Sequence, residues 1–242
     1  MTALIEFREV SKSFGGVHAV EKVDLDLVAG EVHGLLGHNG AGKSTLMKLI
    51  SGVHRIDEGE IRIAGRVASL RGPRDAQEHG IEMIYQDLAL ADNLDAVANL
   101  FLGRELCTRL GLLDERGMER RAAELLADLS PEFRQLREPV GRLSGGQRQM
   151  VAIARALLFD ARVLVMDEPT AALGPAESGN VRALIRRLAG RGMAIVLVSH
   201  DLHDVFELSD RITVMKNGRR VATAPRSTLD PDRVLEMIIA GR

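Results

Sequence analysis

The stretch Gly37-His38-Asn39-Gly40-Ala41-Gly42-Lys43-Ser44 decides how this chain folds. It fits the phosphate-loop template Gly-x-x-x-x-Gly-Lys-[Ser/Thr], with Gly37, Gly42, Lys43 and Ser44 at the fixed positions. Glycines let backbone N–H groups approach a polyphosphate closely, a lysine supplies a point charge, and a serine hydroxyl is a ligand for Mg²⁺. The stretch therefore predicts a cradle for a nucleoside triphosphate.

The sequence on either side of this loop has the order that such a cradle requires. The residues Glu31–Gly37 form a short apolar run suited to a buried strand, and Ser44–Ile50 has helical spacing, so the helix dipole adds to the anion site. A plain glycine turn before a helix is the weaker interpretation. The expected nucleotide-binding residues of the loop are Gly37, His38, Asn39, Gly40, Ala41, Gly42, Lys43, Ser44 and Thr45.

Two adjacent carboxylates follow a second apolar strand, expected at Val163–Met166. Ligands bind beyond the carboxyl ends of strands in open α/β sheets, so Asp167 is expected to hold Mg²⁺ and Glu168 to act as general base toward the attacking water. Taken alone, two acidic residues at a strand end are more often simply solvated. Together with a phosphate loop they indicate a catalytic pair.

The segment Leu143–Gln147 reads LSGGQ and precedes an apolar helix expected over Gln147–Leu158. With the phosphate loop and the Asp-Glu-Pro strand end, it resembles the signature of ATP-binding cassette ATPases, and the resemblance covers nearly the whole chain. It implies an α/β phosphate-loop NTPase (RecA-like), with a parallel-sheet core, an antiparallel β subdomain and an inserted helical subdomain. It also implies ATP and Mg²⁺ as cofactors and ATP hydrolysis as the activity.

In that family the signature of one subunit closes over the γ-phosphate held by the other. The resemblance assigns this role to Ser144, Gly145, Gly146 and Gln147, and it implies a second ATPase subunit, as a homodimer when active. The residue types agree with this role, since Ser144 before glycines forms an anion-binding helix N-terminus. The weaker interpretation is an ordinary helix cap.

Three further residues match the family order. Gln86 follows the strand expected at Ile81–Tyr85 and resembles the glutamine that reaches the metal and the attacking water. His200 follows the strand expected at Ala194–Ser199 and resembles the histidine that contacts the γ-phosphate. Phe14 is the candidate for stacking on adenine, with a core phenylalanine as the open alternative.

One position departs from the family, because Gly174 stands where an aspartate usually makes contacts across the dimer. Glycine has no side chain for such contacts, so either backbone groups replace them or the two nucleotide sites are more loosely coupled. Some sugar-importer members resemble this variant. The departure is therefore not expected to remove catalysis.

Composition indicates an ordinary globular domain. In a chain of 242 residues, 45% are hydrophobic, 27% are charged and the net charge is −2, which disfavours disorder and nucleic-acid binding. We expect one domain over 1–242, with the helical subdomain at about 87–142 and a helical stripe of Met118, Ala122, Leu125 and Leu129. Antiparallel strands are expected at Leu4–Val10, Val23–Val28 and Glu60–Gly65.

The expected location is cytoplasmic, peripheral on the inner face of the cell membrane. The apolar runs are much shorter than the roughly 20 residues that span a bilayer, and Met1–Val10 has no pattern of a secretory leader. A single cysteine, Cys107, permits no internal disulfide and is expected to be buried.

The favoured function is to power import of a solute through separate permease subunits, with indirect dependence on a solute-binding protein. Tyr85–Leu106 resembles the simple-sugar subgroup. Consecutive Leu100, Phe101 and Leu102 cannot all lie on one buried face, so the segment Asn99–Arg104 is expected to dock a permease helix, with a small apolar core as the alternative.

Two other classes of function are weighed against transport. A nucleotide-driven clamp on nucleic acid or the ribosome would carry a long coiled coil between the phosphate loop and the signature, or two cassettes in one chain, and neither pattern is seen. A phosphoryl-transferring kinase shares the phosphate loop but does not need LSGGQ. The sequence does not determine the solute, or whether the cassette pairs with itself or with another.

Overall fold

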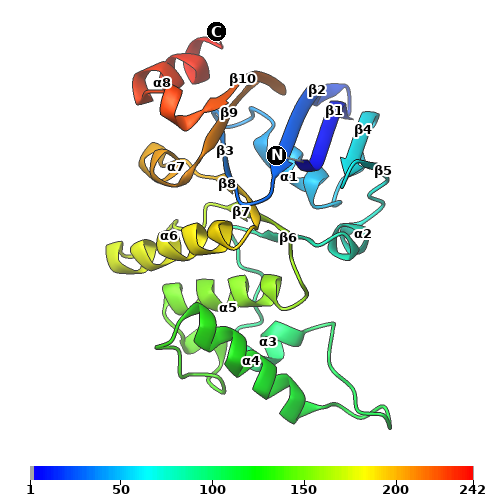
Figure 1. Ribbon diagram of the computed structural model, residues 1–242, viewed down its shortest axis with the longest axis vertical. Coiled ribbons are helices and arrows are strands. Elements are labelled where there is room, and N and C mark those ends of the chain that lie inside the picture. The colour runs from blue at the N-terminus through cyan, green and yellow to red at the C-terminus, as the bar shows by residue number, and fades with distance from the viewer. Residues whose placement is uncertain (1–2, 242) are drawn as a thin grey trace. The chain divides into compact units, whose positions relative to one another are not determined.

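The computed structural model describes residues 3–241, so residues 1, 2 and 242 of the expected domain lie outside the described part. The described chain divides into two compact units. The first contains residues 3–83, 161–168 and 185–241, and the second contains residues 84–160 and 169–184. Figure 1 labels the helices and strands of both units.

The first unit contains an antiparallel sheet of four strands in the order β2-β1-β4-β5. Their bounds are β1 Ala3–Phe14, β2 Val17–Val28, β4 Glu58–Ile63 and β5 Arg66–Ala68. Ile5 and Phe7 alternate with more exposed neighbours along β1, which is the pattern of a sheet with one buried face. The three antiparallel strands expected from the sequence are confirmed.

A second sheet has the strand order β10-β9-β3-β8-β7-β6. The bounds are β3 Val32–Leu36, β6 Ile81–Ile84, β7 Val163–Asp167, β8 Ala194–Val198, β9 Arg211–Lys216 and β10 Arg219–Pro225. The strand β3 pairs in parallel with β8 and β9, and β7 pairs in parallel with β8. All five residues of β3 and of β8 are buried, as expected for parallel strands covered on both faces.

Helices of the first unit include α1 Lys43–Ile50, α2 Pro73–Glu78, α7 Leu202–Leu208 and α8 Pro231–Ala240, with a 3₁₀ turn at Arg226–Thr228. Leu46, Met47, Leu49 and Ile50 of α1 pack in one core with Phe7 of β1 and with buried residues of β7 and β8. The core therefore fixes α1 against both sheets, and with α1 the end of the phosphate loop.

The hairpin between β9 and β10 turns at Asn217 and Gly218, whose φ values are 49° and 79°. Positive φ at both central residues is the requirement of a type I′ turn, which Asn-Gly satisfies. The sequence predicted a hairpin at this dipeptide, and the structure confirms it.

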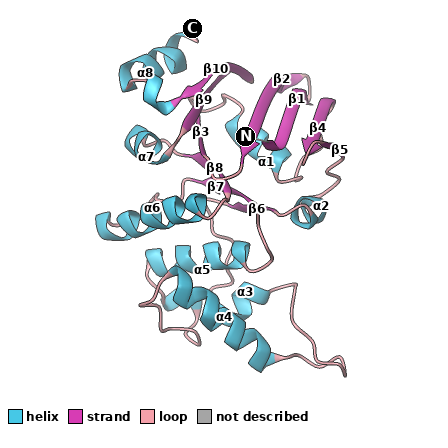
Figure 2. Ribbon diagram, in the orientation of Figure 1, coloured by secondary structure: helices cyan, strands magenta, loops and turns pink. Residues whose placement is uncertain are grey.

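The second unit is built from helices and loops (Figure 2). Its helices are α3 Ala96–Phe101, α4 Glu115–Leu129 and α5 Gly145–Leu157, with a 3₁₀ turn at Val140–Arg142. The helix α6, Pro175–Gly190, begins in this unit and ends in the first. Asn99, fully buried in α3, donates from its side-chain amide to the carbonyls of Ala91 and Leu94 and accepts from Ala91 N–H. This amide ties the preceding loop to α3.

The structure corrects three sequence expectations in the second unit. Leu126, and not Leu125, completes the buried stripe of α4, because a spacing of four residues after Ala122 keeps the side chain on the same face. Cys107 is exposed and not buried. Leu100 and Phe101 are each 1% exposed, so the expected docking surface is wrong for both of them.

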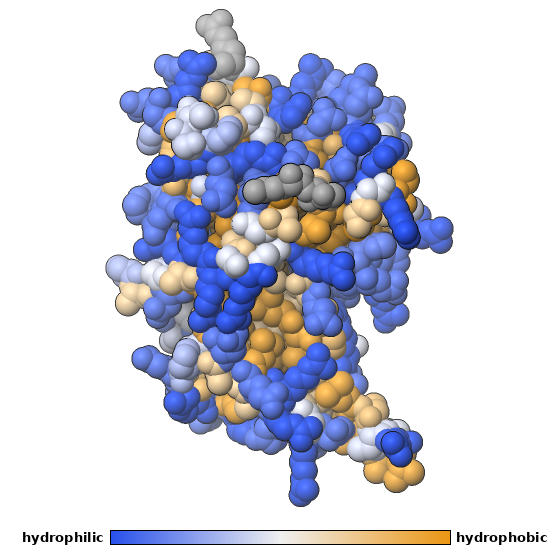
Figure 3. Space-filling view, viewed as in Figure 1, coloured by the Kyte–Doolittle hydropathy of each residue, from blue (hydrophilic) through white to orange (hydrophobic). Residues whose placement is uncertain are grey.

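Apart from Tyr85, the large apolar side chains that the second unit exposes lie in or next to the loop from α3 to α4, at the lower right of Figure 3. Leu102, Leu110, Leu112 and Leu113 are 50%, 87%, 67% and 55% exposed. Phe101, in contrast, packs edge to face with Phe159, with ring centroids 6.4 Å apart. The three consecutive apolar residues 100–102 thus divide between core and surface. None of the helices within residues 3–241 has the length and apolar character that a membrane span requires.

Candidate nucleotide site

The phosphate loop joins β3 to α1, and two of its glycines are required by close backbone packing. Gly42 is the N-cap of α1 with φ 101°, and a Cβ there would lie 2.4 Å from the carbonyl oxygen of Ala19. At Gly37 a Cβ would lie 2.4 Å from the Met215 carbonyl oxygen. A side chain at either position would force the loop to move. The loop is therefore held in one conformation by the strands beneath it.

The ammonium of Lys43 lies inside this loop. Lys43 is 7% exposed, and its Nζ donates to the carbonyl oxygens of Gly37 at 2.6 Å and His38 at 3.1 Å. Burial lowers the pKa of Lys43, while the charges of Asp167 and Glu168 act to raise it. A cation held among carbonyls at a helix N-terminus, with carboxylates close enough to influence it, fits a polyphosphate that brings a divalent cation.

The other loop residues differ in exposure. His38, Asn39, Gly40 and Ser44 are exposed, Thr45 is intermediate and Ala41 is buried. His38 Nδ1 lies 2.6 Å from the carbonyl oxygen of Asn39, within hydrogen-bonding distance. The exposed side of the loop carries Ser44, the hydroxyl that the sequence assigns to the metal.

Asp167 is the last residue of β7, and Glu168 follows it with φ 51°. Burial raises the pKa of the Asp167 carboxyl, the charge of Glu168 adds to this, and Lys43 opposes both. A left-handed φ is strained for a residue with a side chain, and such strain is common at functional sites. The Glu168 N–H donates to the Val198 carbonyl at 2.8 Å, which holds this unusual backbone in place.

His200 contacts the general-base candidate directly. Its Nε2 lies 2.5 Å from Oε1 of Glu168, and the Glu168 side chain is 15% exposed against 58% for His200. The imidazole therefore fixes the direction of the carboxylate. Lys43, Asp167, Glu168 and His200 all belong to the first unit, which thus contains the cation, the metal-ligand candidate and the base candidate.

Phe14, the candidate for adenine stacking, ends β1 in the same unit and is 43% exposed. Its ring contacts His54 edge-on at a centroid distance of 5.0 Å, and Lys12 Nζ lies 5.4 Å from its centroid. The alternative of a buried core phenylalanine does not hold. Its role toward adenine stays a prediction.

The remaining candidates belong to the second unit. Gln86 is exposed, two residues beyond the end of β6. Ser144 caps α5 in a capping box, in which its hydroxyl accepts from Gln147 N–H at 3.3 Å and its own N–H donates to Gln147 Oε1 at 3.0 Å. Gly145 and Gly146 form the first turn of α5. The signature segment is thus the N-terminus of a helix, as the sequence predicted.

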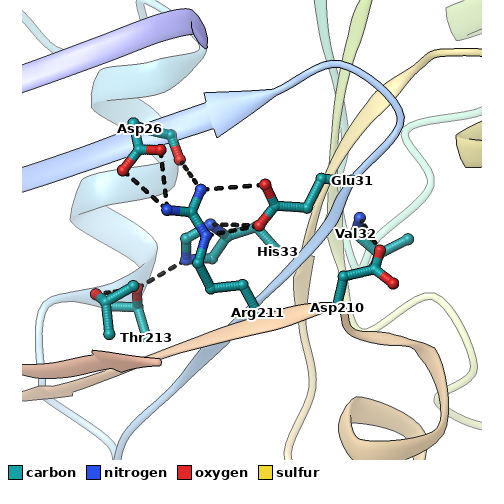
Figure 4. Close-up of polar contacts among 8 residues, drawn as sticks. Asp26, Glu31, Val32, His33, Asp210, Arg211 and Thr213 are labelled. Carbon is teal, nitrogen blue, oxygen red and sulfur yellow. Dashed lines mark hydrogen bonds and ion pairs between the residues drawn. The ribbon is translucent and has the colours of Figure 1, made fainter. Parts of the chain in front are cut away.

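A partly buried polar network, which no sequence motif indicates, holds the start of β3 (Figure 4). Arg211 of β9 donates from Nε to Glu31 at 2.6 Å and from NH1 to Asp26 at 3.0 Å. His33 of β3, 1% exposed, places Nε2 2.7 Å from Thr213 Oγ1. The network joins β2, β3 and β9 at the end of β3 away from the phosphate loop.

The electrostatics of this network keep His33 neutral. Burial is the main cause and the Arg211 charge the second, and together they lower the pKa of His33 from 6.5 to about 3. His33 Nδ1 is buried without a hydrogen-bond partner and lies 3.8 Å from Glu31 Oε1. No single motif encodes these contacts, because the bonded residues are about 180 positions apart along the chain.

The model of the ABC transporter family matches residues 20–171, and this chain belongs to that family. A ribose import ATP-binding protein of Burkholderia ambifaria is 43% identical over 242 residues, which is all of this chain and 48% of the relative. One of Rubrobacter xylanophilus is 46% identical over 237 residues, which is 98% of this chain and 46% of the relative. The chain thus spans about half the length of these curated relatives.

Solved structures agree on the fold. An ATP-binding cassette of an ABC transporter superposes with a TM-score of 0.84 at 24% identity, covering 99% of this chain and 96% of the other. A dimeric cassette in a post-hydrolysis state with ADP and phosphate superposes with a TM-score of 0.77 at 27% identity, covering 92% and 98%. The phosphate-loop NTPase fold expected from the sequence is confirmed.

Proposed function

We propose that this chain is the ATP-binding and ATP-hydrolysing cassette of an importer for a simple sugar. The observation that carries the proposal is the first unit's own arrangement, in which Lys43 lies inside the phosphate loop and His200 fixes the carboxylate of Glu168. The relatives are named as ribose import and putative ribose/galactose/methyl galactoside import ATP-binding proteins, which supports transport over the alternative of a clamp on nucleic acid.

Each site residue of the first unit has a separate role in the proposed reaction. Lys43 and the backbone N–H groups from Gly37 to Thr45 bind the phosphates. Ser44 and Asp167 would hold Mg²⁺, which would supply positive charge to the phosphate oxygens when bound. Glu168 accepts a proton from the attacking water, with its carboxylate oriented by His200, which also contacts the γ-phosphate. Phe14 stacks on adenine.

The site is completed by a second cassette. Ser144, Gly145, Gly146 and Gln147 would close over the γ-phosphate held by that partner, because a capped helix N-terminus offers N–H donors and a positive dipole end. One solved relative of this fold is a dimer with ADP and phosphate, which supports this arrangement. The partner is a second copy of this chain or another cassette.

The cassette would act at the inner face of the cell membrane with permease subunits, and a solute-binding protein would deliver the sugar to them. The exposed leucines around the loop from α3 to α4 replace Leu100 and Phe101 as the apolar surface available in the helical unit. Leu102, at the end of α3, belongs both to this surface and to the segment expected to dock a permease helix.

The substitution Glu168→Gln tests this function. It removes the proton acceptor and keeps the size of the side chain, so steady-state hydrolysis falls by about 100-fold or more while ATP affinity is retained. An ATP-dependent dimer accumulates, as measured by gel filtration. Glu236→Gln, an exposed change on α8, is the matched control with normal turnover. Unchanged hydrolysis in Glu168→Gln would overturn the proposed role of this carboxylate.

A further inference from the structure

The carboxylate of Glu177 lies against the signature segment of its own chain. Glu177 is the third residue of α6, and its Oε1 accepts from the hydroxyl of Ser144 at 2.9 Å and from Gly146 N–H at 3.2 Å. Its Oε2 accepts from Gly174 N–H at 3.4 Å. All four residues belong to the second unit, so the contact is internal to it.

These donors are the ones that a phosphate at the signature would need. The Ser144 hydroxyl has one proton, and its oxygen already accepts from Gln147 N–H at 3.3 Å. The proton given to Glu177 is therefore not available to a second acceptor. At Gly146 a Cβ would lie 2.9 Å from both Cγ and Oε1 of Glu177, so the carboxylate packs directly on the glycine backbone.

We propose that Glu177 is an internal latch on the signature segment, whose carboxylate holds Ser144 and Gly146 until the γ-phosphate of a partner's ATP displaces it. The inference rests on the proposed function, because it assumes that the signature completes a partner's site. Two anionic groups cannot share one hydroxyl proton and one N–H at short range without repulsion. The latch therefore raises the ATP concentration at which two cassettes close.

Helix capping is the other role that these contacts suggest. A glutamate at the third position of a helix reaches back to the N–H of the N-cap residue, here Gly174, as half of a capping box. Glutamine serves the same position in capping boxes. Glu177→Gln therefore keeps the cap and the shape of the side chain and removes the charge that holds the latch closed.

The experiment uses the 242-residue chain with Glu168→Gln, so that hydrolysis does not consume the ATP, and measures the ATP concentration needed to form the dimer. Adding Glu177→Gln lowers the ATP concentration at half-maximal dimer formation by about fivefold. A change of this size corresponds to the loss of one partly exposed hydrogen bond to a charged group. The charge-removing change Glu124→Gln on the exposed face of α4 is the matched control and leaves it unchanged. Sedimentation velocity at a series of Mg-ATP concentrations gives the readout.

A second variant separates the hydrogen bond from the charge. Glu177→Asp keeps the charge but is one methylene shorter, so it loses the reach to Ser144 and also lowers the ATP requirement. If capping is the whole role, both variants dimerise at the wild-type ATP concentration or a higher one, which overturns the latch. If Glu177→Gln does not fold, Glu177→Asp alone tests the latch, because an unchanged or higher ATP requirement in that variant would overturn it.

The outcomes also separate the latch from the function it rests on. If Glu168→Gln dimerises with ATP and the Glu177 variants do not shift the ATP dependence, the latch is wrong and the composite site stands. If Glu168→Gln itself never dimerises with ATP, the composite site is wrong and the latch is wrong with it. A shift of several fold in both Glu177 variants, with the control unchanged, supports both.

Discussion

His33 makes the stability of the first unit depend on pH in a way that can be calculated. Its pKa is about 3 in the folded chain and has the ordinary value of 6.5 when exposed by unfolding. Between these two pKa values the unfolded chain binds a proton that the folded chain does not bind. The stabilising contribution of the neutral His33 is therefore complete above pH 6.5 and is lost as the pH falls below it. At pH 5, about 1.5 pH units below the unfolded pKa, the loss is about 2 kcal/mol.

The assay compares wild type with His33→Gln, whose amide reaches the position of Nε2 and can bond Thr213 but does not titrate. Urea unfolding is followed by circular dichroism at pH 7 and pH 5, because the chain has no tryptophan. Between pH 7 and pH 5, the free energy of unfolding of wild type is expected to fall by about 2 kcal/mol more than that of the variant. The carboxylates of Asp26 and Glu31 and the other histidines are common to both proteins, so their effects cancel. Equal losses in the two proteins would refute the assignment of His33 as the buried neutral group.

Two substitutions test the loop and the core. Gly42→Ala places a Cβ 2.4 Å from the Ala19 carbonyl oxygen, so a fluorescent ATP analogue should bind about tenfold more weakly or worse. Gly40→Ala, where a Cβ meets nothing within 4 Å, should lose less affinity. Equal affinities of the two variants would contradict the packing argument. Phe101→Ala removes a ring that is 1% exposed and should lower the free energy of unfolding by about 3–5 kcal/mol. Leu102→Ala should lower it by less than about 0.5 kcal/mol. A Phe101→Ala variant as stable as wild type would mean that the ring does not belong to the core.

The phosphate loop and its flanking elements could be predicted from sequence because their physics is local. Glycines at Gly37 and Gly42, an apolar run before them and helical spacing after them lie within twenty residues. The Asn217-Gly218 hairpin is local in the same sense, because the turn type needs only two positive φ values. Such patterns specify an element without knowledge of its neighbours.

The polar contacts that hold the site could not be predicted in this way. Arg211 and Glu31 are separated by 180 positions, and Ser144 and Glu177 by 33, so no periodicity links them. Burial of single residues also depends on neighbours. Phe101 becomes core because Phe159 meets it, whereas Leu102, one position later, remains half exposed. The composite nature of the site stays a prediction, since the described chain is one cassette.

Hydrolysis by a mixture of two inactive variants tests the composite ATPase most directly. Lys43→Ala cannot hold ATP, and Ser144→Arg cannot close over a partner's γ-phosphate, so each alone should be inactive. Their heterodimer unites the intact phosphate loop of one chain with the intact signature of the other. With the heterodimer isolated through two different affinity tags, we predict ATP hydrolysis at up to about half the wild-type rate, because one of two sites is restored. A pure heterodimer that hydrolyses no more ATP than its two parents would contradict the account.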